Sequence, residues 1–78
     1  MNEYLLLALI KKLEGEIALH KANIRVYMDN PAGIGEHPQI LEAIESEVAA
    51  LAEAEEKKTT IEVSLLGEWI IMKNKRST

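Results

Sequence analysis

The two prolines of the chain lie close together, and this placement limits the possible folds more than any other feature. Pro31 and Pro38 stand in the ten-residue segment DNPAGIGEHP, residues 29–38, together with two of the four glycines. Proline interrupts helices and glycine adopts turn conformations, so the segment predicts a reversal of the chain. The order of Asn30, Pro31 and Gly33 fits a type I turn.

The chain before this turn has the apolar spacing of a helix. From Leu6 to Tyr27 the apolar positions alternate steps of four and three residues, and His20 is the one polar member. This spacing places them on one face, as in a heptad repeat. Asn2 is suited to cap the start, and Pro31 pushes residue 30 out of the helical region. We therefore expect a helix over about residues 2–29.

The chain after the turn is also predicted to be helical. Pro38 suits a first helical turn, where its missing N–H is not needed. Helical spacing then recurs at Leu41, Ile44, Val48 and Leu51, and again at Ile61, Leu65, Trp69 and Met72. A β-hairpin is the alternative over residues 59–73, since this stretch contains alternating β-branched residues and a central glycine. We favour one helix from residue 38 to about residue 73.

Two long helices joined by a short turn predict an all-α fold, an antiparallel helical hairpin. Residues 1–78 form a single domain, with helices over about 2–29 and 38–73 and a turn over 30–37. Folding the helices together pairs Ile24 with Ile44, His20 with Glu47 or Val48, and Leu6 with Ile61. At about 1.5 Å per residue the helices are about 42 and 54 Å long, so residues 66–72 should overhang the shorter helix.

The end of the hairpin opposite the turn, here called the open end, is expected to be strongly apolar. The run YLLLALI, residues 4–10, is apolar on all sides, and one neighbouring helix cannot cover it. We therefore predict a homo-oligomer, in the simplest case a dimer, as a four-helix bundle or a larger helical assembly. The predicted interface comprises Leu5, Leu6, Leu9, Ile10, Leu65, Leu66, Trp69, Ile70 and Met72. Seven apolar residues are too few to cross a bilayer, which takes about 20, so no membrane contact is expected.

The sequence predicts no catalytic, metal or cofactor site. The segment GIGEHP lacks the third glycine of a dinucleotide-binding fingerprint, and no Walker lysine follows it. Neither His20 nor His37 follows a glutamate at the Glu-x-x-His spacing of carboxylate metal sites, and they lie far apart along the hairpin. His20 is instead expected to hydrogen-bond Glu47 or a symmetry-related chain and to help fix the register. The chain is therefore predicted not to be an enzyme.

Charge narrows the choice of partners. The net charge of −4 argues against a nucleic-acid-binding protein with a broad basic face. Residues 29–56 contain eight acidic side chains and no lysine or arginine, so pairs across the hairpin, such as Arg25 with Glu42 or Glu45, are expected. The turn is predicted to bind an unidentified protein partner through Asp29, Asn30, Glu36 and His37. The second hypothesis is a nucleic-acid-binding accessory protein that acts through the basic residues 73–76.

The turn also carries a resemblance. Asn30, Pro31, Gly33, Ile34, Gly35, Glu36, His37 and Pro38 spell an N-P-x-G-I-G-E-H-P motif. With its surroundings, residues 21–57, this motif resembles a family of short uncharacterised proteins from contractile-tailed, cyanophage-like phages and marine metagenomes. The resemblance implies a phage-encoded accessory protein in the cytoplasm of a host cell, and it implies no particular chemistry. In this setting the second hypothesis becomes a nucleic-acid-binding accessory protein of phage replication or recombination.

Overall fold

The computed structural model describes residues 3–29 and 38–76, and every element in this part of the chain is helical. Helix α1 spans Glu3–Met28 and α3 spans Pro38–Thr60. A π-helical stretch, η1 (Ile61–Leu66), follows without a break and leads into α4 (Gly67–Arg76). The prediction of an all-α hairpin is confirmed, and the β-hairpin alternative over residues 59–73 is wrong. The predicted cap Asn2 and the turn 30–37 lie outside the described residues.

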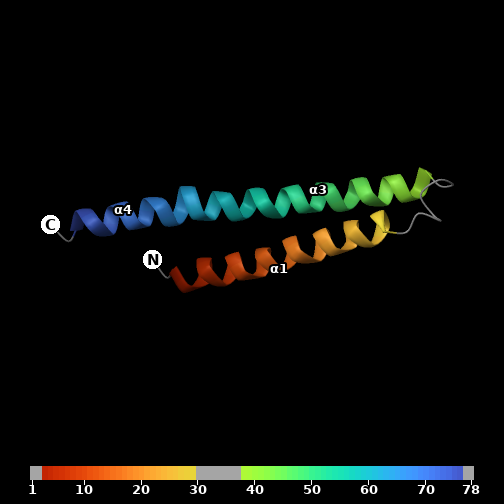
Figure 1. Cartoon of the computed structure of the whole chain (residues 1–78). Coiled ribbons are helices and arrows are strands. Elements are labelled where there is room, and N and C mark those ends of the chain that lie inside the picture. Colours follow the sequence, from red (N-terminus) through yellow and green to blue (C-terminus); the bar gives the residue numbers. More distant parts are fainter. Residues whose placement is uncertain (1–2, 30–37, 77–78) are drawn as a thin grey trace.

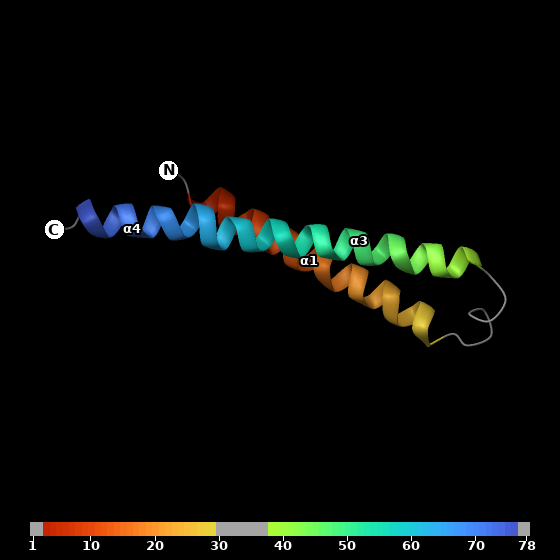
Figure 2. The same ribbon diagram turned by 90° about the horizontal axis from the view of Figure 1, so that it is seen from above.

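The molecule is a thin rod made of two antiparallel helical arms. Helix α1 lies along α3, and the arm formed by α3, η1 and α4 extends past the beginning of α1 (Figure 1). Seen from above, the two arms cross at a shallow angle (Figure 2). The Cα atoms span 64 × 15 × 14 Å. With only two helices side by side, most residues have one face in water.

The core is correspondingly small. Four of the described residues are buried: Ile10, Leu13, Ala54 and Ile61. Leu6, Ile17 and Leu66 pack against this cluster. Leu13 and Ala54 are the most deeply buried, at 2% and 3% exposed. The single methyl group of Ala54 leaves room for the large side chains of the opposite helix that pack in this cluster.

The π-helical stretch changes which leucine reaches this core. Within it the backbone N–H of Gly67 bonds to the carbonyl of Glu62, five residues back instead of the usual four. The wider turn rotates the helix, so the core residue after Ile61 is Leu66, while Leu65 is 44% exposed. The predicted seam from Ile61 to Leu65 is therefore wrong by one residue.

The expected overhang is present and begins one residue later than predicted. Leu66 still packs on the core, whereas α4, which starts at Gly67, has no contact with α1 among the described residues. Figure 1 shows α4 continuing beyond the start of α1 with no helix beside it. In α4 the apolar side chains of Ile70, Ile71 and Met72 are exposed to solvent.

Candidate functional site

Glu47 of α3 accepts hydrogen bonds from α1 and so joins the two arms. His20 of α1 and Glu47 of α3 are both partly buried, and Nδ1 of the ring lies 2.6 Å from Oε2 of the carboxylate. An ionised carboxylate only accepts, so the ring N–H donates. The hydrogen bond from His20, followed by one from Asn23, holds the pKa of Glu47 below its ordinary value of 4.5. The predicted contact between His20 and Glu47 is confirmed.

We expect Glu47→Gln to weaken the dependence of stability on pH. The pKa of Glu47 is lowered in the fold, so its ionised form stabilises the hairpin above pH 4.5, and this contribution is lost as the pH falls through the lowered value. Glutamine cannot ionise, so the free energy of unfolding of the variant should fall less on acidification. Urea titrations followed by circular dichroism at neutral and acid pH measure the difference.

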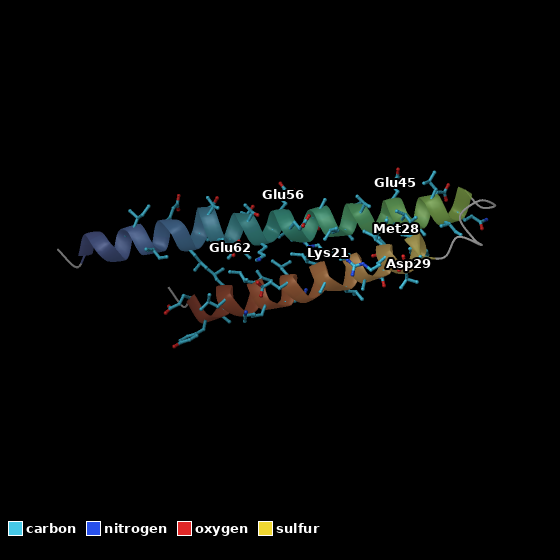
Figure 3. All side chains as sticks on the ribbon, viewed as in Figure 1. Lys21, Met28, Asp29, Glu45, Glu56 and Glu62 are labelled. Carbon is cyan, nitrogen blue, oxygen red and sulfur yellow. The ribbon has the colours of Figure 1, made fainter. Side chains whose placement is uncertain are left out.

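The matched control is Glu45→Gln on the same helix. Glu45 is exposed and projects from the side of α3 that faces away from α1 (Figure 3). It should keep the pH dependence of the wild type. An equal change in both variants would mean that the loss of one negative charge, and not the loss of the hydrogen bond to His20, causes the change in acid sensitivity.

A groove of about 560 Å³ runs between the arms nearer the open end. Its floor includes Leu13 and Ile61 from the core, and Leu9 borders it on α1. Five charged residues line it: Glu56 and two ion pairs, Lys12 with Glu16 and Lys57 with Glu53, and these two pairs are here called the rim. The groove therefore combines an apolar floor with charged side chains of both signs, a composition suited to binding the surface of another protein.

The rim charges are paired along each helix. Lys12 Nζ lies 2.6 Å from Glu16 Oε1 on α1, and Lys57 Nζ lies 2.9 Å from Glu53 Oε1 on α3. The bond from Lys57 holds the pKa of Glu53 below its ordinary value, although the nearby charge of Glu16 opposes that effect. Glu16 and Glu53 line the groove from opposite arms, and their charges interact.

The pairing of charges between the arms differs from the prediction. Lys58 Nζ of α3 lies 3.3 Å from Glu14 Oε2 of α1. Lys11, and then Lys58, lowers the pKa of Glu14. Among the described residues no ion pair joins Arg25 to Glu42 or Glu45, so that expectation is wrong. The contribution of such solvated pairs to stability is small, and the hairpin depends chiefly on its apolar core.

Comparison with protein-family models, curated proteins and solved structures finds no match for this chain. Function is therefore inferred from the hairpin itself.

The predicted interface residues fall into two groups. Ile10 is buried within the hairpin, and Leu6 and Leu66 pack against the same core, so these three stabilise the single chain. The exposed members are Leu5, Leu9, Leu65, Ile70 and Met72. The backbone of Trp69 belongs to α4, but its side chain lies outside the described part of the structure.

Exposed apolar side chains gather at the open end. Of the fourteen large apolar residues found exposed in the described part of the chain, nine lie in the first two turns of α1 or in η1 and α4. They are Tyr4, Leu5, Leu7, Leu9, Val63, Leu65, Ile70, Ile71 and Met72. Scattered exposed leucines are ordinary, whereas a cluster of this kind at one end indicates a contact surface.

The other predicted site residues are only partly described. Asp29 is exposed, and its backbone N–H lies 2.9 Å from the carbonyl of Arg25, which closes the last turn of α1. Asn30, Glu36 and His37 lie outside the described residues, as do the side chains of the basic residues 73–76.

Two kinds of feature are absent from the described residues. Within residues 3–29 and 38–76, no three histidine or acidic side chains converge to hold a metal ion. None of the helices described has the length and apolar character required to traverse a bilayer. The groove and the open end are thus the features from which a function can be argued.

Proposed function

We propose that the chain is a noncatalytic, self-associating helical hairpin that acts as a protein-interaction or structural accessory protein. The observation that carries this proposal is the cluster of exposed apolar side chains at the open end. Burial of apolar area contributes roughly 25 cal/mol per Å², so leaving such a cluster in water costs stability that association would recover. A second copy of the chain can cover side chains of this cluster.

Helix α4 supports the same conclusion. It has ten residues and no neighbouring helix among the described residues, apart from the η1 stretch that it continues. Most of the stability of a helix in a protein comes from packing of its apolar face, and the described part of α4 has no such packing partner. A partner that covers Ile70, Ile71 and Met72 would therefore stabilise α4 as well as bury these apolar side chains.

The size of the core points in the same direction. Four buried residues are few for a chain of 78 residues, and small domains commonly gain stability by oligomerisation. Two hairpins joined into a four-helix bundle share one larger core. A dimer is the smallest assembly that provides it.

The proposed biological setting follows from the turn motif. Its resemblance to short phage proteins implies an accessory protein in the cytoplasm of an infected cell. In that setting the oligomer would form the scaffold, and the turn at the far end of each rod would bind a protein partner. Loops held on rigid scaffolds commonly carry such binding functions.

Substitution at the open end tests the proposal. Leu5→Asp introduces a charge at a side chain that is 71% exposed, and Leu41→Asp does so at one that is 72% exposed but lies near the turn. Both positions lie near the N-terminus of a helix, where aspartate is favourable, so neither change should disturb the hairpin. We expect wild type and Leu41→Asp to be dimers and the dissociation constant of Leu5→Asp to rise at least about tenfold.

Light scattering across a concentration series measures this difference. A wild-type chain that stays monomeric at every concentration would overturn the proposal. Equal weakening in both variants would show that association does not use the open end.

A further inference from the structure

The rim of the groove has a direction. The arms are antiparallel, so residue numbers rise along one arm as they fall along the other. Two residues at the same height along the rod, here called level, therefore have numbers with a nearly constant sum. The hydrogen-bonded pair His20 and Glu47 sets the value of that sum. By this measure Lys12 lies within two residues of the level of Lys57, and Glu16 lies within two residues of the level of Glu53. The rim is therefore positive toward the open end and negative one turn closer to the loop.

We propose that a second copy docks on this groove face in the antiparallel sense, about a two-fold axis perpendicular to the rod. This inference rests on the proposed self-association and specifies its geometry. The axis passes near residue 14 of α1 and residue 55 of α3, midway between the charges of each arm. These two positions lie within two residues of one level, so a single axis passes close to both.

This arrangement satisfies the charges of the rim. It places Lys12 opposite the partner's Glu16, and Lys57 opposite the partner's Glu53. In a parallel arrangement, with both open ends at the same side, lysines would face lysines and glutamates would face glutamates. Opposite charges across an interface fix its register, and juxtaposed like charges oppose the wrong one.

The apolar side chains of α1 fit the same symmetry. Leu5, Leu9 and Leu19 are exposed, and their spacing with the rim residues Lys12 and Glu16 is that of one helical stripe. Rotation about the two-fold axis near residue 14 reverses the direction of the partner helix, and this reversal brings Leu9 level with the partner's Leu19. Leu5 then reaches the next turn of the partner helix, where Asn23 continues the stripe. The N-terminal end of the stripe in one copy is thus covered by the C-terminal end of the stripe in the other copy.

The second arm is suited to close contact. Reversal about position 55 brings Ala50 level with the partner's Thr60, and Ser46 level with the partner's Ser64. These side chains are small, so the two α3 helices can approach closely. The same reversal places residues 67–72 of α4 level with residues 38–43 of the partner, where the partner's Gln39 and the partner's Ala43 continue the same stripe. The position of Leu41 is two residues from each of these and so lies on the opposite face of the helix.

Inversion of the rim tests this geometry. The variant Lys12→Glu/Glu16→Lys/Glu53→Lys/Lys57→Glu exchanges the two signs and keeps the pairs along each helix. In the antiparallel arrangement the variant is again complementary to itself, so its dimer should match that of the wild type. A mixed dimer of variant and wild type would place like charges opposite each other. We expect its share in an equimolar mixture to fall at least about fivefold below the statistical half.

Native mass spectrometry of the mixture, with one chain isotopically labelled, counts the three dimers. Mixed dimers above the statistical half would show parallel docking, and a share of one half would show that the rim does not orient the copies. Either result overturns the inference while leaving self-association intact. Failure of wild type alone to dimerise would instead overturn the proposed function.

Disulfide trapping gives an independent readout. The chain has no cysteine, so Leu9→Cys and Leu19→Cys each introduce a single thiol. Antiparallel docking predicts that an oxidised mixture of the two variants forms mainly the mixed covalent dimer. Predominant crosslinking of each variant to itself would contradict the proposed axis. Circular dichroism confirms that each variant remains helical.

Discussion

We expect Leu13→Ala to lower the free energy of unfolding by about 2–5 kcal/mol, the range found when a buried leucine is truncated to alanine. Leu13 is 2% exposed and lies in the centre of the small core between the arms. Few other buried side chains surround it, so their rearrangement cannot fill the cavity. Small domains are stable by only about 5–15 kcal/mol, so this loss removes much of the total.

Urea unfolding followed by circular dichroism at a fixed protein concentration measures the loss. The control is Leu41→Ala, which removes the same atoms from an exposed position on α3. We expect that change to alter the free energy of unfolding by no more than about 0.5 kcal/mol. A similar loss in both variants would show that the packing of the arms does not determine stability.

We expect Ala54→Leu to destabilise the hairpin by about 1–3 kcal/mol, although leucine is a good helix former and adds apolar surface. Ala54 is 3% exposed and packs in the same cluster as Leu13. The added methyl groups would have to push the arms apart. The bond between His20 and Glu47, two turns away on α3, would then lengthen.

The control for this change is Ala52→Leu, at an exposed position of the same helix. It tests helix propensity without altering the contact between the arms. Thermal unfolding should separate the two variants clearly, with Ala52→Leu close to the wild type. If Ala54→Leu proved as stable as its control, the arms would have to be further apart than the structure places them.

Helical spacing in the sequence predicted most of the fold because it acts over many residues. The seam from Leu6 to Tyr27 specified one apolar face, and the proline-containing segment specified where the direction reverses. Together they set the register well enough to predict that His20 meets Glu47. The length difference between the helices, a matter of counting residues, likewise predicted the overhang.

The details that were predicted wrongly depend on features that the spacing of apolar residues does not encode. Leu65 and Leu66 are the same residue type, so the pattern could not show that a wider turn brings the second to the core. Lysine and arginine side chains are long and flexible, so the sequence could not show that Lys58 would pair with Glu14. The groove did have a signal: Leu9, Lys12 and Glu16 form a second stripe beside the apolar seam.

The rod shape affects how the molecule behaves in small-angle scattering and gel filtration. Its radius of gyration is 18.0 Å, against about 11.5 Å for a compact chain of this length. A single hairpin therefore elutes ahead of a globular protein of equal mass and can be mistaken for a dimer. Antiparallel docking doubles the mass and thickens the rod while lengthening it little. The cross-sectional radius from scattering should thus report assembly more directly than elution volume does.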